Sequence, residues 1–209
     1  MKYDHIIFDV DGTLIDTDYA ILHSLQRVLS QSENRWMEAS ELRFALGIPG
    51  ADALKLLGCE DVEGILEKWD KEMDNFSDEI TIFQGIPDVL EHLSKEGHSL
   101  GIVTSRTCKE FEKDFTPLGM NGYFGTIIRA DDTLEHKPKP APLEKYLELT
   151  GQTRERVIYV GDSEYDMLCG EAAGVDCALA LWCGRGKRQI SATYYLDKPE
   201  DLLEILGNR

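Results

Sequence analysis

The sequence predicts an α/β fold built on a doubly wound parallel sheet, with an all-helical domain inserted near its start. Two observations support this: short apolar runs alternate with helical patterns, and one long segment shows helical spacing alone. The candidate strands are five apolar runs rich in β-branched residues, at 5–10, 99–105, 125–132, 156–163 and 176–182. Runs that are apolar throughout are typical of strands buried on both faces. Their alternation with helices indicates that the strands run parallel.

Three segments between the later strands have helical patterns. In residues 87–96, Val89, Leu90 and Leu93 share one helical face, and Pro87 suits a first helical position. Residues 142–150 and 164–173 show similar patterns.

Residues 18 to about 82 interrupt the alternation. Their apolar residues fall at helical spacing in four groups, which are Ile21, Leu22, Leu25, Val28 and Leu29; Leu42, Ala45 and Leu46; Leu54 and Leu57; and Ile65, Leu66 and Trp69. We expect no strand here, and Gly85 to Pro87 marks the return to the alternating pattern. The sequence thus predicts a core domain of residues 1–15 and 83–209 and a helical domain of residues 16–82.

Composition limits the possible partners. The 209 residues are 42 % hydrophobic, which is enough to bury a core, and 39 acidic against 22 basic side chains leave a net charge of −17. This charge argues against binding of nucleic acid or of an anionic membrane. A small anionic ligand remains possible, because a cation or a local basic group can reverse the sign of one pocket.

Cysteine usage and the N-terminal residues favour a cytoplasmic protein. The five cysteines form no CxxC pair and their number is odd, which indicates reduced thiols. The opening residues MKYDHIIFDVD carry acids inside their apolar run, unlike a signal peptide. No run reaches the ~18 apolar residues of a membrane span. The sequence does not decide the oligomeric state, which could be monomer or dimer.

Two pairs of carboxylates lie where predicted strands end. Asp9 and Asp11 are two residues apart, so on an extended chain they face the same side at the carboxyl end of the first strand. Asp162 and Asp166 follow another apolar strand, and a helix is expected to begin near Ser163. Ligands of open α/β sheets bind at these strand ends. A turn or a helix cap explains any one of these acids, but not four that converge.

Four carboxylates at one site need compensation. One ionised pair at ~4 Å costs about 4 kcal/mol at an effective dielectric constant near 20. Oxygen ligands without histidine or cysteine point to a hard cation, most often Mg²⁺. We therefore expect a magnesium site formed by Asp9, Asp11, Asp162 and Asp166.

A hydroxyl pair and a lysine suggest a phosphate group beside that metal. Thr104 and Ser105 end the second predicted strand, where backbone N–H groups of a following helix also point. Lys137 lies in the stretch EHKPKPAP, in a loop stiffened by prolines. A fixed ammonium would balance phosphoryl oxygens that the metal does not reach. Lys139 is the competing candidate.

These motifs, in this order, resemble those of the haloacid dehalogenase-like hydrolases. The matching residues are DVDGT at 9–13, Thr104, KPKP at 137–140 and GDSEYD at 161–166. The resemblance spans nearly the whole chain. It implies a Rossmann-like core and makes residues 16–82 a helical cap of the type called C1.

The resemblance also implies roles for the matched residues. Asp9 would be the nucleophile that carries the phosphoryl group, and Asp11 would protonate the leaving oxygen and later deprotonate water. Asp9, the backbone carbonyl of Asp11 and Asp162 would hold Mg²⁺, with Asp166 ligating or supporting it. Two further residues would bind the phosphoryl oxygens, namely Thr104 and Lys137.

An acid at position 11 favours a phosphatase or phosphomutase over the dehalogenases and ATPases of this family. Residues 41–58 resemble the cap of phosphoglycolate phosphatase-like enzymes, where Arg43 would contact a substrate carboxylate unless it is merely a solvated helix residue. We therefore expect a Mg²⁺-dependent phosphatase of small phosphomonoesters, similar to phosphoglycolate phosphatase. The alternatives are a β-phosphoglucomutase-like phosphomutase, a pyrophosphatase or nucleotide phosphatase, and a non-enzymatic phosphate-binding regulator.

Overall fold

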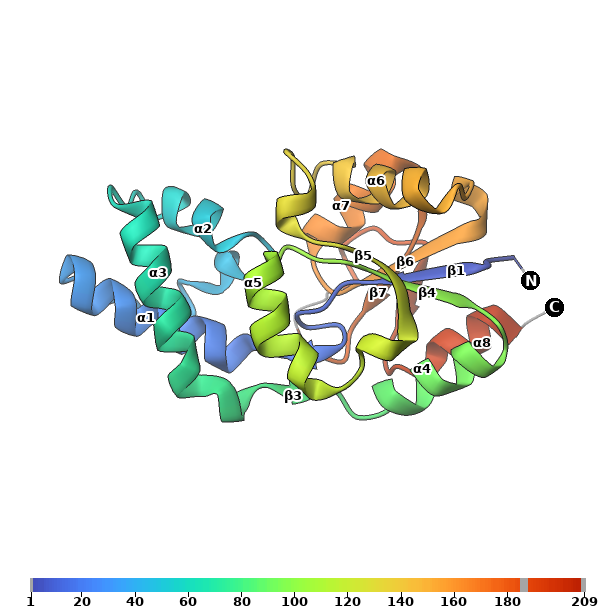
Figure 1. The fold of residues 1–209 in the computed structure, drawn as a ribbon, viewed down its shortest axis with the longest axis horizontal. Helices are drawn as coiled ribbons and strands as arrows, with labels where there is room; N and C mark the ends of the chain where they lie inside the picture. The colour runs from blue at the N-terminus through green and yellow to red at the C-terminus, as the bar shows by residue number, and fades with distance from the viewer. Residues whose placement is uncertain (1, 185–187, 208–209) are drawn as a thin grey trace.

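A six-stranded parallel sheet forms the centre of the molecule (Figure 1). The computed structural model describes residues 2–184 and 188–207. The strands are β1 (His5–Phe8), β4 (Ser99–Val103), β5 (Phe124–Ile128), β6 (Val157–Gly161), β7 (Asp176–Ala180) and β8 (Tyr194–Leu196). Their order across the sheet is β5-β4-β1-β6-β7-β8. This confirms the predicted α/β class and all five predicted strands, whereas β8 was missed because three residues are too few to show a period.

Helices cover both faces of this sheet. The helices α4 (Ile86–Lys95) and α8 (Asp201–Gly207) lie on one face, and α6 (Ala141–Thr150) and α7 (Glu164–Ala173) lie on the other (Figure 1). The central strand β1 shows why both faces are apolar, because Ile6 and Phe8 join one hydrophobic cluster while Ile7 joins the other. This alternation is the period-two geometry of a strand buried on both sides.

The inserted segment is helical and extends to one side of the sheet (Figure 1). Its helices are α1 (Asp18–Glu33), α2 (Gly50–Leu56) and α3 (Val62–Met73), with 3₁₀ helices at Arg43–Ala45 and Asp74–Glu79. α1 packs along α3, and the indole N–H of Trp69 donates to the Ser24 hydroxyl at 2.8 Å. The Ser24 hydroxyl therefore accepts from an indole N–H that would otherwise be buried without a hydrogen-bond partner.

Two short strands join the insertion to the sheet domain. β2 (Ile15–Asp16) pairs antiparallel with β3 (Thr81–Ile82), so the chain enters and leaves the insertion side by side. The expectation of no strand within residues 18 to about 82 was wrong at β3, and β2 was not predicted, since two-residue strands carry no readable periodicity. The division into domains of 1–15 with 83–209 and of 16–82 stays a prediction.

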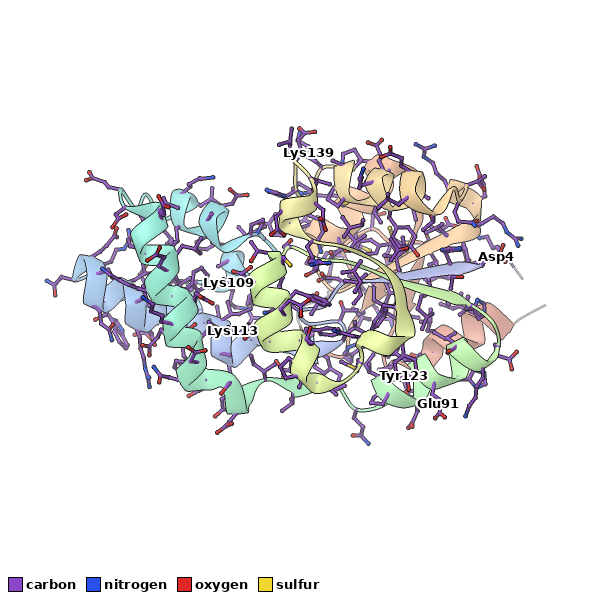
Figure 2. All side chains as sticks on the ribbon, viewed as in Figure 1. Asp4, Glu91, Lys109, Lys113, Tyr123 and Lys139 are labelled. Atoms are coloured by element: carbon purple, nitrogen blue, oxygen red, sulfur yellow. The ribbon has the colours of Figure 1, made fainter. Side chains whose placement is uncertain are left out.

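A helical segment after β4 contacts the insertion. It comprises α5 (Cys108–Glu110), a π-helical turn (Phe111–Phe115) and a 3₁₀ turn (Thr116–Leu118), and further 3₁₀ turns lie at Asn121–Tyr123, Ala130–Asp132 and Arg154–Arg156. Lys109 and Lys113 extend from it toward α3 and pair with Asp70 at 2.6 and 3.1 Å (Figure 2).

Among the described helices, none is long and apolar enough to cross a membrane.

Candidate active site

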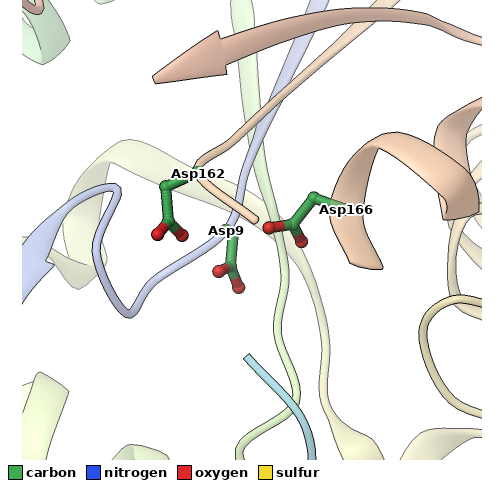
Figure 3. Close-up of side chains that lie close together, drawn as sticks. All are labelled: Asp9, Asp162 and Asp166. Carbon is green, nitrogen blue, oxygen red and sulfur yellow. The ribbon is translucent and has the colours of Figure 1, made fainter. Parts of the chain in front are cut away.

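Three buried carboxylates meet at the carboxyl edge of the sheet. β1 and β6 are parallel neighbours with Phe8 opposite Val160, so Asp9 and Asp162 emerge side by side. Asp166 comes from the first turn of α7. One oxygen of each acid lies within 4.8 Å of the others, and all three residues are buried (Figure 3). The structure thus brings together three of the four acids expected to converge.

The start of α7 fixes Asp166. Its Oδ2 accepts hydrogen bonds from the backbone N–H and the hydroxyl of Ser163 at 3.1 and 2.6 Å, and the Ser163 hydroxyl accepts from the Asp166 N–H. This reciprocal capping box leaves Oδ1 directed at the site. Gly161 permits the approach, because a Cβ there would lie 2.5 Å from the Asp166 Cβ.

Lys137 lies among these acids. Its Nζ is 2.8 Å from both Asp9 Oδ1 and Asp166 Oδ1, and 3.0 Å from the Tyr159 hydroxyl. The side chain is 1 % exposed. Lys139, the competing candidate, is exposed at the outer edge of the molecule (Figure 2). The geometry therefore favours Lys137 as the lysine of the site.

One ammonium does not fully compensate three carboxylates. Burial raises the pKa of Asp9 to about 8, against the opposing attraction of Lys137. Burial also works against ionisation of Asp166, but Lys137 and three hydrogen bonds outweigh it and leave the pKa of Asp166 below its usual value. The pKa of Lys137 is raised despite its burial, because both acids attract the proton. Three buried oxygen ligands with excess negative charge fit a hard divalent cation such as Mg²⁺.

Asp11 points its carboxylate elsewhere. Oδ2 accepts from Arg106 Nε and Oδ1 from Arg106 Nη2, each at 2.8 Å, and the Thr17 hydroxyl donates to Oδ1 at 2.6 Å. The expected shared face with Asp9 is lost because β1 ends at Phe8 and the chain turns at Gly12, whose φ is +81°. Strand alternation therefore does not extend to Asp11.

The hydroxyl residues after β4 make different contacts. Thr104 is buried, and its Oγ1 accepts from the Arg106 N–H at 3.2 Å. Ser105 donates to the Gly47 carbonyl at 2.9 Å and so links the sheet domain to the insertion. Arg43 is half-exposed, lies 4.0 Å from Asp18 and does not line the cavity described next.

A cavity of about 70 Å³ lies between the insertion and the carboxyl edge of the sheet. This is room for on the order of five water molecules. Asp9, Asp11, Ser105 and Arg106 line it from the sheet domain. The insertion contributes a largely apolar wall that includes Ile48, Leu66, Trp69 and Met73. The cavity therefore combines a polar floor, which carries the candidate nucleophile, with an apolar roof.

Two polar residues of the site were not predicted. Arg106 directly follows the hydroxyl pair in GIVTSR, and Tyr159 lies within the apolar run RVIYVGDS. The Tyr159 hydroxyl donates to Asp166 Oδ1 at 2.7 Å or to the Val103 carbonyl at 3.1 Å. A tyrosine in a strand buried on both faces needs a polar partner, and this requirement was the available signal.

The motif resemblance is confirmed by comparison with known proteins. A family model described as haloacid dehalogenase-like hydrolase matches residues 6–180. Pyrophosphatase PpaX of Halalkalibacterium halodurans is 31 % identical over 99 % of this chain and 98 % of its own length. Pyrophosphatase PpaX of Bacillus cereus is 29 % identical over 100 % of this chain and 98 % of its own length.

Solved structures share the whole fold. A Lactobacillus plantarum protein provisionally named a phosphoglycolate phosphatase superposes with a TM-score of 0.90 at 28 % identity, covering 98 % of this chain and 100 % of that one. CbbY from Rhodobacter sphaeroides, solved in complex with phosphate, has the same fold, with a TM-score of 0.83 at 20 % identity over 96 % of both chains. The chain therefore belongs to the haloacid dehalogenase-like hydrolases and is a phosphatase of that family.

Proposed function

We propose that the protein is a Mg²⁺-dependent pyrophosphatase that transfers a phosphoryl group to Asp9 and then to water. The observation that carries the proposal is the likeness to pyrophosphatases over nearly the full length of both chains, in a molecule whose Asp9 lines a cavity beside the insertion. The relatives favour this alternative over the phosphoglycolate phosphatase-like function expected from the sequence. Arg43, which was to contact the carboxylate of such a substrate, does not line the cavity.

The lining of the cavity supports a phosphorylated substrate. Its sheet-domain side carries the candidate nucleophile Asp9 and the candidate proton carrier Asp11.

Each polar residue then has a defined task. Asp9 attacks the phosphorus, and Lys137 reduces the repulsion between that carboxylate and the incoming anion. Asp11 gives a proton to the leaving oxygen and later takes one from water, a role worth roughly 10²- to 10⁴-fold in rate. Thr104 and Ser105 are the proposed hydroxyl donors to the phosphoryl oxygens.

The metal ligands are proposed from the acid cluster and from the family resemblance. Asp9 and Asp162 would hold Mg²⁺, with Asp166 ligating or supporting it. The family resemblance adds the backbone carbonyl of Asp11 as a ligand. The bound ion would screen the negative charge of the phosphoryl oxygens during transfer.

A substrate panel tests the proposal. Phosphate release is measured with pyrophosphate, phosphoglycolate, β-glucose 1-phosphate and a nucleoside monophosphate, with Mg²⁺ or with EDTA. We expect kcat/KM for pyrophosphate to exceed the others by at least about tenfold, since a pocket matched to one ligand's polar groups rejects ligands that leave them unpaired. EDTA should abolish release. A higher kcat/KM for phosphoglycolate would instead support a phosphoglycolate phosphatase. Interconversion of glucose phosphates would support a phosphomutase.

The raised pKa of Asp9 predicts that Mg²⁺ binds more tightly as pH rises. The charges of Lys137, Asp11, Asp162 and Asp166 all act on Asp9. Burial raises the pKa of Asp9 to about 8, so without metal it holds a proton below that pH. The unfolded chain loses this proton near pH ~4, so the Asp9 contribution to stability falls as pH rises from ~4 to ~8. Mg²⁺ competes with the proton, so its affinity should increase about tenfold per pH unit below 8 and then level off.

Titration with Mg²⁺ between pH 6 and 9, followed by thermal unfolding, measures this dependence. The matched control is Asp88→Asn, because Asp88 is an exposed acid of α4 on the sheet domain. The control should reproduce the wild-type profile. A dissociation constant that is constant between pH 6 and 8 would contradict the buried, protonated Asp9.

A further inference from the structure

Arg106 is a buried cation in the wall of the cavity. It follows Ser105 at the end of β4, and its side chain is 8 % exposed. Among the described residues that line the cavity, it is the one with a cationic side chain. The pKa of Arg106 is raised even though burial opposes its charge, because Asp11 and Asp114 attract the guanidinium. The cavity wall therefore carries a fixed positive charge in addition to the carboxylate of Asp9.

One side of the guanidinium is anchored to the protein. Nη1 donates to Asp114 Oδ2 at 2.6 Å and to the Glu110 carbonyl at 3.4 Å, both in the helical segment after β4. These two contacts hold the Arg106 guanidinium against the helical segment that follows β4. The opposite edge, formed by Nε and Nη2, is the edge that contacts Asp11.

This opposite edge has the geometry that binds an oxyanion. Nε and Nη2 each donate to a different oxygen of Asp11 at 2.8 Å, which is the two-pronged arrangement of arginine with carboxylate or phosphate. Asp11 is also the proposed proton carrier. Both of its oxygens accept from Arg106, and Oδ1 accepts from Thr17 as well, so the carboxylate is held by these two residues.

We propose that the Nε–Nη2 edge of Arg106 binds a second anionic group of the substrate, and that Asp11 occupies this edge when no substrate is present. The second anion displaces the Asp11 carboxylate, which then turns to the leaving oxygen. Arg106 thereby selects phosphorylated substrates with an additional phosphate or carboxylate next to the bond that is cleaved. The proposal rests on the proposed function in one respect, namely that Asp9 accepts the phosphoryl group.

Pyrophosphate satisfies this requirement directly. Its bridging oxygen is the leaving oxygen, and the second phosphoryl group is attached to that same oxygen. With one phosphorus at Asp9, the second group lies in the same cavity, which Arg106 also lines. Phosphoglycolate has the corresponding chemistry with a carboxylate, whereas p-nitrophenyl phosphate has no second anion.

The variant Arg106→Lys tests the inference, because it keeps the charge and removes the two-pronged edge. We measure kcat/KM for pyrophosphate, phosphoglycolate and p-nitrophenyl phosphate in the wild type and the variant. The ratio of pyrophosphate to p-nitrophenyl phosphate should fall about 30- to 100-fold, mainly through a higher KM for pyrophosphate. A purely structural role for Arg106 would lower all three values together, and an unchanged ratio would overturn the inference.

Two further measurements make the outcome specific. Asp114→Asn removes the anchoring carboxylate while leaving the proposed edge, so its ratio should change less than fivefold. Binding of methylenediphosphonate, which is not cleaved, should weaken at least about tenfold in Arg106→Lys, and equal binding would overturn the inference even if the variant were inactive.

The substrates also separate the two proposals. Wild-type enzyme that does not cleave pyrophosphate would refute the proposed function, while the ratio of phosphoglycolate to p-nitrophenyl phosphate would still test Arg106. Whichever of the two ratios falls further in Arg106→Lys identifies phosphate or carboxylate as the group that Arg106 binds.

Discussion

Replacing Asp9 by asparagine is expected to lower kcat for pyrophosphate by at least about 10⁴-fold, as for other enzymes that lose their nucleophile. The asparagine side chain keeps the size of the aspartate but offers a neutral amide in place of the attacking carboxylate. The substitution also removes one of the three clustered acids, so the affinity for Mg²⁺ should fall as well. The lost rate should not return at saturating Mg²⁺, because the missing nucleophile is not supplied by the metal.

Steady-state phosphate release measures this effect, with Asp88→Asn as the matched control. Asp88 is exposed on α4, so its amide variant should retain wild-type kcat within about twofold. Circular dichroism and thermal unfolding establish that Asp9→Asn is folded. A variant with a robust Mg²⁺-dependent rate would show that another group receives the phosphoryl group.

Replacing Lys137 by methionine is expected to lower both activity and stability. The ammonium makes 2.8 Å contacts with Asp9 and Asp166 inside the protein, and methionine leaves both carboxylates without their cation. Removing one partner of a buried ion pair commonly costs about 3–5 kcal/mol. The loss of a positioned cation at the phosphoryl oxygens should lower kcat by roughly 10²- to 10³-fold.

Lys139→Met provides a closely matched control for this variant. Lys139 is two residues away on the same loop but exposed, so its replacement should leave kcat unchanged and the free energy of unfolding within about 0.5 kcal/mol of wild type. Chemical denaturation with and without Mg²⁺ measures the stability. Added Mg²⁺ should restore part of the stability of Lys137→Met, because it supplies positive charge to the same acids. Equal stability and activity of the two variants would refute the assignment of Lys137.

The meeting of Asp9 with Asp162 was predictable from the sequence because it follows from sheet topology. Parallel strands end at the same edge, and the apolar runs before both acids were long enough to identify as β1 and β6. Asp166 was predictable for a similar reason, since Ser163 marked the beginning of α7 and set the acid in its first turn. These placements depend on local patterns that a sequence displays directly.

The pairing of Asp11 with Arg106 was not predictable in this way. It depends on where β1 stops, on the turn at Gly12 and on a side-chain contact between residues 95 positions apart. The antiparallel pair of β2 and β3 and the strand β8 escaped prediction because two or three residues show no period. The lining of the cavity depends on how the insertion packs against the sheet domain. The motif resemblance supplied the residue roles, whereas the contacts that position those residues came from the structure.

The central claim is that Asp9 receives the phosphoryl group beside a metal held by neighbouring acids. A crystal structure grown with Mg²⁺ and beryllium fluoride, which mimics a phosphoryl group on a carboxylate, tests it most directly. We predict beryllium bonded to a carboxylate oxygen of Asp9, with Mg²⁺ coordinated by Asp9 and Asp162 and with Lys137 in contact with fluoride. Beryllium fluoride on another side chain, or Mg²⁺ bound away from Asp9 and Asp162, would contradict it.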